Sequence, residues 1–262
     1  MERIGLVQPN AMKAKMDSGG LAVGMIVRLV RGAEITAIAR SAGFDSLYID
    51  LEHCSFSLET IGQMCIAAAA IGVTPLVRTA GLDKTEIART LEAGAQGIIV
   101  PHVETRSEAE AMVDAARFAP AGTRSLLGAN PHTLFRAGPP QETMRQMNEA
   151  TLVVAMVESR TAVENVDQIA GVDGLDMLLV GTNDLCASLG RTGDFEHPEV
   201  AEAYAQVAEA CRRHGKHLGV GGLSSRPDVA RRMIDLGARY VSAGSDTGFL
   251  MSAGVSAAGQ FG

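Results

Sequence analysis

Two carboxylates in this chain stand where they could bind a divalent metal ion. Glu158 follows the apolar run Leu152–Val157, and Asp184 follows a second apolar run that begins at Met177. Two carboxylates delivered to one rim by buried strands suit Mg²⁺ or Mn²⁺, which also tolerates open positions for water or substrate. Taken singly, each is more simply a helix-start carboxylate that caps the helix or complements its dipole. The metal interpretation therefore depends on both residues reaching the same place.

A second group of residues suited to catalysis is the segment Asp50-Leu51-Glu52-His53. Residues 50 and 52 point to the same side of an extended chain, and His53 begins the loop that follows. An imidazole held by a carboxylate is a general base tuned near neutral pH. The spacing is equally compatible with a structural ion pair and a histidine that caps the loop.

Arg78 ends a run that is otherwise apolar, residues 74–78. A guanidinium there can stabilise a developing oxyanion without losing its own proton. It can also form a salt bridge with Asp50 or Glu52 at the rim, and the two roles are compatible.

These side chains must be positioned by a regular succession of short apolar runs. Eight runs of the buried-strand type, each followed by a helical pattern, lie near residues 22–27, 46–50, 74–78, 96–100, 152–157, 176–180, 217–220 and 239–243. Eight strand–helix units in a chain of this length predict a (β/α)8 TIM barrel, an α/β fold in which residues 1–262 form a single domain. A doubly wound open sheet is the alternative, but it usually has fewer units.

Three segments lie outside this alternation. An amphipathic helix is expected around residues 10–16, and a weakly apolar helix after Asp246 is expected to pack on a neighbouring subunit. Residues 120–140 are rich in Gly, Pro and Asn, and a long stretch without a clear period predicts a functional loop.

The positions of the lysines argue against Schiff-base chemistry. In a barrel of this kind the active site lies at the carboxyl ends of the strands. Lys13 and Lys15 belong to the N-terminal helix and Lys216 precedes its strand, so only Lys84 lies near the required end. Metal-assisted chemistry is therefore favoured over a lysine nucleophile.

The bulk composition excludes several classes of partner. The chain has 262 residues, 47% of them hydrophobic, and a net charge of -7, which disfavours a nucleic-acid partner. No signal pattern begins the sequence, and no apolar run approaches the roughly 20 residues that span a membrane. The four cysteines show no CxxC spacing and are expected to be reduced thiols. These features predict a soluble, cytoplasmic protein that acts on a small molecule.

Several motifs together resemble the HpcH/HpaI aldolases. They are Tyr48-Ile-Asp-Leu-Glu-His53, Pro75-Leu-Val-Arg78, Gly97-Ile-Ile-Val-Pro101, Ala119-Pro-Ala-Gly-Thr-Arg124, Val157-Glu158 and Gly181-Thr-Asn-Asp-Leu-Cys-Ala-Ser-Leu-Gly190. The similarity runs in register from about residue 21 to residue 250. It implies a metal-dependent class II pyruvate aldolase of the phosphoenolpyruvate/pyruvate superfamily, with a (β/α)8 fold. It also implies a homo-oligomer, a hexamer or trimer, whose C-terminal helices are exchanged between subunits.

The resemblance implies a role for each metal and oxyanion group. Glu158 and Asp184 would hold Mg²⁺, Mn²⁺ or Co²⁺, which chelates the carboxylate and keto oxygen of a 2-oxo acid. Arg78 would stabilise the enolate oxygen. The implied reaction cleaves or forms 4-hydroxy-2-oxo acids from pyruvate, or a close 2-oxo acid, and an aldehyde.

Proton transfer and substrate binding are implied for the remaining motif residues. His53, oriented by Asp50, would move protons through a water, and Glu52 would orient Arg78 or His53. After Gly181, the backbone N–H groups of Thr182 and Asn183 would bind the substrate carboxylate at a helix N-terminus.

This chain departs from the family pattern at several positions. Met156 stands where many relatives have a glutamine, the loop Gly181-Thr182-Asn183-Asp184 replaces the usual Gly-Pro-x-Asp, and the loop after Arg124 is not the common Gly-rich version. These departures also allow a barrel that binds a 2-oxo acid without turning it over. Two further alternatives use the same enolate chemistry: an oxaloacetate-like 2-oxo acid decarboxylase and a CoA-ester lyase.

Overall fold

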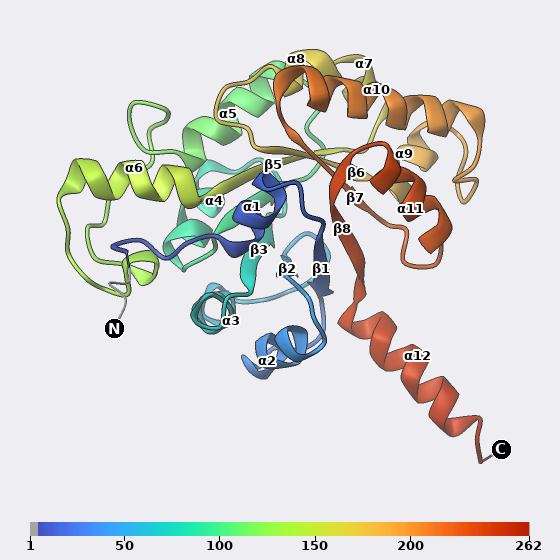
Figure 1. Cartoon of the computed structure of the whole chain (residues 1–262), viewed down its shortest axis with the longest axis horizontal. Coiled ribbons are helices and arrows are strands. Elements are labelled where there is room, and N and C mark those ends of the chain that lie inside the picture. Colours follow the sequence, from blue (N-terminus) through green and yellow to red (C-terminus); the bar gives the residue numbers. More distant parts are fainter. Residues whose placement is uncertain (1–4, 262) are drawn as a thin grey trace.

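A closed barrel of eight parallel strands forms the centre of the protein, as the computed structural model of residues 5–261 shows (Figure 1). The strands are β1 (Ala22–Val27), β2 (Ser46–Asp50), β3 (Thr74–Arg78), β4 (Gly97–Val100), β5 (Leu152–Val157), β6 (Met177–Gly181), β7 (His217–Gly221) and β8 (Ala238–Ser245). They follow one another around the barrel in sequence order, and β8 pairs with β1 to close it. The predicted (β/α)8 fold is confirmed.

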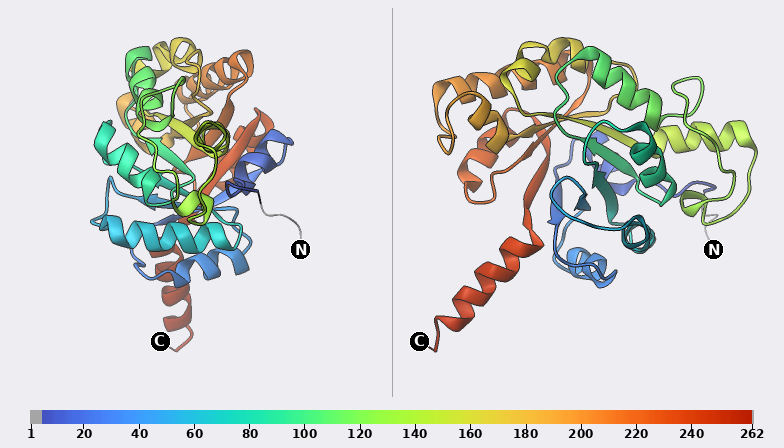
Figure 2. Two further views of the ribbon diagram at one scale, coloured as in Figure 1. Left: turned by 90° about the vertical axis from the view of Figure 1, so that its left-hand side faces the viewer. Right: turned by 180° about the vertical axis from the view of Figure 1, so that it is seen from behind.

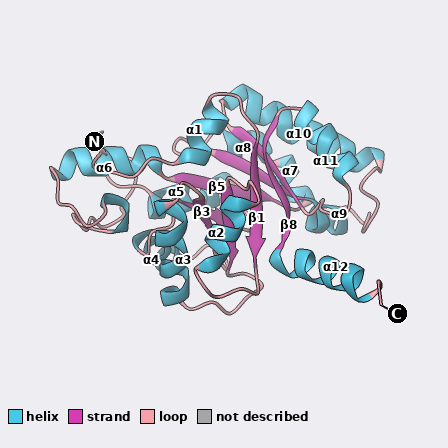
Figure 3. Ribbon diagram, turned by 60° about the horizontal axis from the view of Figure 1, so that its bottom comes forward, coloured by secondary structure: helices cyan, strands magenta, loops and turns pink. Residues whose placement is uncertain are grey.

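The described chain contains twelve helices, most of which lie on the outer side of the sheet (Figure 3). They are α1 (Ala11–Asp17), α2 (Glu34–Ser41), α3 (Leu58–Ala70), α4 (Lys84–Glu92), α5 (Arg106–Ala116), α6 (Pro140–Ala150), α7 (Arg160–Glu164), α8 (Val166–Ala170), α9 (Thr182–Ser188), α10 (Pro198–His214), α11 (Pro227–Asp235) and α12 (Asp246–Ala258), with a 3-10 turn, η1 (Pro131–Thr133). Local chemistry explains several of the helix starts, because a side-chain oxygen at the N-cap accepts an N–H of the first turn. Ser57, Asp83 and Ser159 do so for α3, α4 and α7, and Thr105 forms a capping box with Glu108 at α5.

The strands are buried on both faces because they separate two hydrophobic cores. Outward side chains such as Val77 and Val153 pack against the helices, while inward side chains such as Tyr48, Leu76 and Leu179 fill the barrel itself. Burying one such aliphatic side chain stabilises the fold by about 1.5–3 kcal/mol. Double-sided burial accounts for the near-continuous apolar runs in the sequence.

The amino-terminal end of the barrel is covered by α1. Met12 and Met16 of this helix are buried and join the inner core. Asn10 caps the helix and its amide donates to the carbonyls of Gln96 and Ala150, which fixes α1 to the strand connections. The opposite end of the barrel carries the candidate site residues.

Residues 120–140 do not contribute to the polar end. They follow α5 and lead through η1 to α6, so this helix-to-strand connection belongs to the amino-terminal side of the barrel. Asn130, His132 and Thr133 are buried, and Arg124 pairs with Glu92. Within this chain the segment has a packing role, and none of these residues lines the cavity described below.

The C-terminal helix α12 projects away from the barrel in every view (Figures 1 and 2). Phe249, near its start, packs on Phe44 with ring centroids 5.9 Å apart. Beyond this contact Leu250, Met251 and Val255 are exposed. Among the described residues, no helix combines the length and apolar character that crossing a membrane requires.

Candidate active site

A cavity of about 350 Å³ opens at the carboxyl ends of the strands. Seven of the nine candidate site residues line it: His53, Arg78, Glu158, Gly181, Thr182, Asn183 and Asp184. Two others, Asp50 and Glu52, are not part of the lining and contact Arg78 instead. The barrel thus gathers at one end groups that come from β2, β3, β5 and β6 and the segments that follow them.

Glu158 and Asp184 lie on neighbouring strand ends and influence one another electrostatically. Glu158 is buried, and its carboxylate occupies space that only a glycine at position 181 leaves open, since a Cβ there would lie 2.3 Å from Oε1. Burial raises the pKa of Glu158 above its ordinary value, and the negative charges of Asp184 and Glu52 raise it further. Asp184 is exposed and has no hydrogen-bond or ion-pair partner among residues 5–261.

The donor set fits a hard divalent cation. Two carboxylates that repel one another, one of them desolvated, are stabilised by a cation between them. No group of three or more His, Cys, Asp or Glu side chains in the described part of the chain is arranged to hold a metal. A cation held by Glu158 and Asp184 would therefore depend on water or substrate for its other ligands.

Arg78 is held rigidly by two carboxylates from β2 and the loop after it. Its Nε and Nη2 donate to the two oxygens of Asp50 at 3.0 and 2.6 Å, and its Nη1 lies 2.6 Å from Glu52 Oε2. Arg78 is only 4% exposed but still lines the cavity. Both carboxylates contact Arg78, as the alternation of residues 50 and 52 predicts. The predicted salt bridge of Arg78 is therefore present.

The expected side-chain pairing of Asp50 with His53 is not what the structure shows. Asp50 accepts from Arg78, from Arg28 Nε at 2.7 Å, and from the backbone N–H groups of Glu52 and His53. The carboxylate nearest to the His53 imidazole is that of Glu52, at 3.8 Å. Burial alone would raise the pKa of Asp50, but the two arginines together hold it below its ordinary value. Two permanent cations outcompete an imidazole for this fully buried anion.

His102 is a site residue that sequence reasoning passed over. It follows β4 with a φ of 54°, and its ring lies between two carboxylates, with Nε2 3.0 Å from Glu52 Oε1 and Nδ1 3.4 Å from Glu158 Oε2. Its backbone N–H also donates to Glu158. Its position directly after a strand was the available signal, but nothing in its neighbours distinguished it from an ordinary loop residue.

The first turn of α9 presents backbone N–H groups beside Glu158. Gly181 is the N-cap and offers no side chain to satisfy them. The Thr182 hydroxyl is buried and forms hydrogen bonds with Tyr204 and with the carbonyl of Gly221. Because these bonds engage the hydroxyl, only the backbone N–H of Thr182 is a candidate for substrate binding. Asn183 is exposed and lines the cavity.

Met156 forms part of the cavity floor with Tyr48. The Tyr48 hydroxyl donates to Met156 Sδ at 3.6 Å, a weak acceptor compared with an amide oxygen. The Arg78 guanidinium lies 5.4 Å from the centroid of the Tyr48 ring. Burial raises the pKa of Tyr48 well above its ordinary value, so this phenol is neutral.

A closed (β/α)8 barrel with a polar cavity at the carboxyl ends of its strands has the architecture of the TIM-barrel enzymes. The chain belongs to the HpcH/HpaI aldolase/citrate lyase family, which matches residues 28–253. The protein is therefore an enzyme of the lyase class.

Individual relatives are similar over nearly the whole chain. A 4-hydroxy-4-methyl-2-oxoglutarate aldolase of Hapsidospora irregularis is 36% identical over 255 residues, which cover 95% of this chain and 94% of the relative. A 4-hydroxy-2-oxo-heptane-1,7-dioate aldolase of Klebsiella pneumoniae subsp. pneumoniae is 33% identical over 252 residues, 96% of this chain and 94% of the relative. The crystal structure of an HpcH/HpaI aldolase from Desulfitobacterium hafniense DCB-2 is similar with a TM-score of 0.89 and 29% identity, covering 95% of each chain.

Proposed function

We propose that this protein is a divalent-metal-dependent aldolase that cleaves or forms 4-hydroxy-2-oxo acids, with pyruvate or a close 2-oxo acid as one product and an aldehyde or ketone as the other. The observation that carries the proposal is the placement of Arg78, His53, Glu158 and Asp184 in one cavity. The names of the fungal and bacterial relatives, both aldolases of 4-hydroxy-2-oxo acids, support the substrate class. The proposal treats the whole chain as one barrel domain.

Glu158 and Asp184 would hold the metal, for which Mg²⁺, Mn²⁺ and Co²⁺ are the candidates. When bound, such an ion supplies a Lewis acid for the oxygens of a 2-oxo acid. Gly181 keeps the space beside Glu158 free, so that the buried carboxylate can reach the cavity.

Arg78 would stabilise the negative charge that develops when the carbon–carbon bond breaks. In the cleavage direction a proton leaves the 4-hydroxyl, the C3–C4 bond breaks, and its electron pair passes to the oxygen at C2. A guanidinium fixed by Asp50 and Glu52 needs no reorganisation to meet that charge. Asp50 and Glu52 are positioning residues in this scheme, because they act through Arg78.

His53 would accept the hydroxyl proton and return a proton to C3 of the enolate. It lines the cavity, and its ring is half-exposed, so a water can carry the proton between the imidazole and the substrate. The substrate carboxylate would be bound by the backbone N–H groups of Thr182 and Asn183, where α9 begins.

The proposal is tested by incubating the purified protein with pyruvate and Mn²⁺ in D2O. We expect hydrogen exchange at C3, seen by NMR, and cleavage of a 4-hydroxy-2-oxo acid, both abolished by a chelator. Decarboxylation of oxaloacetate without either activity would favour a decarboxylase. Pyruvate binding without exchange or cleavage would instead favour a barrel that only binds 2-oxo acids.

The exposed apolar face of α12 supports a homo-oligomer in which this helix packs on another copy. Leu250, Met251 and Val255 present an apolar surface that no other part of residues 5–261 covers. Analytical ultracentrifugation tests this idea, since a chain ending at residue 247 should lose the oligomeric state of the full chain. A monomeric full-length protein would rule it out.

A further inference from the structure

We propose that Arg28 binds a carboxylate on the aldehyde or ketone partner, so that the preferred substrates of this enzyme are 4-hydroxy-2-oxo diacids. This inference rests on the proposed aldolase function and names the substrate class of the same cavity. In this role Arg28 determines whether a charged or a neutral aldehyde or ketone is preferred as the acceptor. That role is separate from the chemistry at C2 and C3.

Arg28 lies on the far side of the cavity from the carboxylates of the candidate metal site. It directly follows β1, and in the closed order of eight strands β1 is diametrically opposite β5, the strand that Glu158 follows. Both residues line the cavity. A substrate whose 2-oxo acid end is anchored at Glu158 and Asp184 therefore extends toward Arg28 with its other end.

The backbone of Arg28 is fixed by the neighbouring strand. β8 pairs with β1 up to the register partners Ile26 and Ser245, and the next residue, Asp246, accepts the backbone N–H of Arg28 at 3.0 Å. The same carboxylate accepts the N–H groups of Leu29 and Val30. Because the backbone is already fixed, the Arg28 side chain loses little conformational entropy when it binds a ligand.

The guanidinium of Arg28 is oriented but not saturated. Its Nε donates to Asp50 Oδ2, a fully buried acceptor that is already shared with Arg78. The two terminal nitrogens, which carry four of the five N–H donors of a guanidinium, make no hydrogen bond to any of residues 5–261. The planar edge they form matches the geometry of a carboxylate, which it can bind through two parallel hydrogen bonds.

A second unsatisfied polar group lies on the same wall. The Ser242 hydroxyl on β8 is buried, lines the cavity and has no hydrogen-bond partner in the described chain. Gly221 on β7 leaves room beside it, since a Cβ there would come within 2.9 Å of Ser242 Oγ. A buried hydroxyl without a hydrogen-bond partner costs free energy. A ligand with oxygen atoms would supply the missing partner on this side of the cavity.

The expected effect is a preference of about 10- to 100-fold for a carboxylated acceptor over a neutral one of equal length, because a charged hydrogen-bonded pair contributes this much when one partner is removed. The test compares glyoxylate with acetaldehyde and succinic semialdehyde with butanal, each with pyruvate and Mn²⁺. For each pair the ratio of kcat/KM values is the readout. The C3 exchange of pyruvate in D2O, which needs no acceptor, is measured in parallel.

The variants are Arg28→Gln, Arg28→Lys and the control Arg89→Gln. Arg89 is an exposed arginine of α4 outside the cavity, so its replacement matches the charge change and should leave the ratio as in the wild type. Arg28→Gln should reduce the ratio to near one, and Arg28→Lys should give an intermediate ratio because the ammonium keeps the charge but not the two-pronged edge.

A binding measurement makes the test independent of turnover and of variant yield. Calorimetry with the Mn²⁺-loaded protein compares 2-oxoglutarate with 2-oxopentanoate, which has the same length but lacks the distal carboxylate. Tighter binding of 2-oxoglutarate to wild type, lost in Arg28→Gln or weakened in Arg28→Lys, supports the proposal. Equal binding by wild type, or a preference that survives both substitutions, overturns it. Absence of C3 exchange in wild type would instead contradict the aldolase function itself.

Discussion

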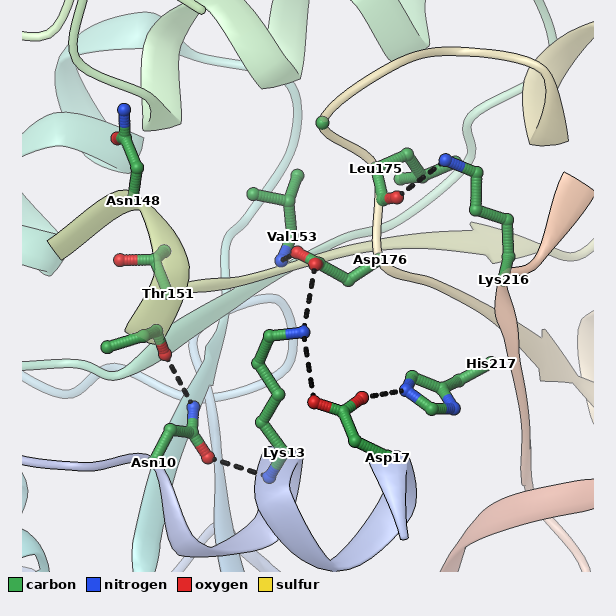
Figure 4. A network of polar contacts seen from close by, with 12 residues as sticks. Asn10, Lys13, Asp17, Asn148, Thr151, Val153, Leu175, Asp176, Lys216 and His217 are labelled. Carbon is green, nitrogen blue, oxygen red and sulfur yellow. Dashed lines mark hydrogen bonds and ion pairs between the residues drawn. The ribbon is translucent and has the colours of Figure 1, made fainter. Parts of the chain in front are cut away.

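The two ends of the barrel use the same kinds of charged side chain to opposite effect. At the amino-terminal end, Asp176 accepts the backbone N–H of Val153 and lies 3.5 Å from Lys13 Nζ (Figure 4). It also pairs with Arg117. At the carboxyl end, Asp184 has no partner in the described residues, and the pKa of Glu158 is raised by burial and by its acidic neighbours.

The difference separates groups that stabilise the fold from groups that serve the reaction. A carboxylate surrounded by donors from a helix, a strand and a loop fixes those elements to one another. Carboxylates left to repel one another destabilise the protein, and such groups are retained where a ligand supplies the missing charge. Substitutions at the two ends should therefore change different quantities.

The largest effect is expected for Glu158→Gln at the carboxyl end. Loss of a metal-ligand charge should lower kcat/KM for cleavage about 1000-fold or more. The free energy of unfolding of the metal-free protein should rise, because a neutral amide removes both the desolvation penalty and the repulsion by Asp184. Steady-state kinetics and urea unfolding with a chelator present measure the two quantities. A variant that loses stability along with activity would contradict the distinction between the two ends.

Asp176→Asn at the amino-terminal end should do the reverse. Arg117, whose side chain is only 5% exposed, would lose its carboxylate partner, and we expect the free energy of unfolding to fall by about 3 kcal/mol. Activity per folded molecule should be retained, because the residue lies far from the cavity lining. The control is Asp17→Asn, whose half-exposed pair with His217 should contribute less than about 1 kcal/mol. Equal losses in both variants would count against the interpretation.

Arg78→Lys sharpens the comparison within the carboxyl end. Lysine keeps the charge but cannot reproduce the hydrogen bonds to both oxygens of Asp50, and kcat/KM should fall about 100-fold. The matched control is Arg124→Lys, because Arg124 is also buried and paired with a carboxylate, Glu92, but lies outside the cavity. That variant should lose stability without a comparable change in kcat/KM, as thermal unfolding and kinetics together would show.

The smallest effect concerns Lys216 at the amino-terminal end, whose Nζ donates to the carbonyls of Val172 and Leu175. Burial lowers the pKa of Lys216 below its ordinary value in the folded protein. Between that lowered pKa and the unfolded value of about 10.4, the unfolded chain binds more protons, so the free energy of unfolding gains a contribution that rises with pH. Urea unfolding at several pH values up to 10 should show this rise in wild type and its loss in Lys216→Met. Parallel pH profiles of the two proteins would refute it.

Much of the fold was accessible from the sequence because strand positions are encoded locally. The eight apolar runs predicted the strands to within one or two residues at most ends. β8 is longer than predicted, reaching Ser245, because it continues to pair with β1 at Ile26. The functional loop predicted at residues 120–140 stays a prediction, because this helix-to-strand connection does not line the cavity of its own chain, and composition alone does not show at which end of the barrel it lies.

The candidate site was predictable in its members and not in its contacts. Counting residues just past the strand ends placed Glu158, Asp184, Arg78 and His53 at one end of the barrel, where the structure has them. Nothing local indicated that His102 would lie between Glu52 and Glu158, because those partners come from other strands. The catalytic and metal-binding roles of Glu158, Asp184, Arg78 and His53 stay predictions for the experiments above.

The sequence by itself determined the barrel and the end of it that carries chemistry, since apolar periodicity and the residues after each strand are properties of short segments. Tertiary structure alone decided which charges meet. Closure of the barrel brings Arg28 from β1 beside Asp50 from β2, and the two arginines then take the carboxylate that the sequence had paired with His53. Such pairings depend on which side chains from separate strands reach the same carboxylate. In a buried site the permanently charged guanidinium groups form stronger hydrogen bonds to it than an imidazole does.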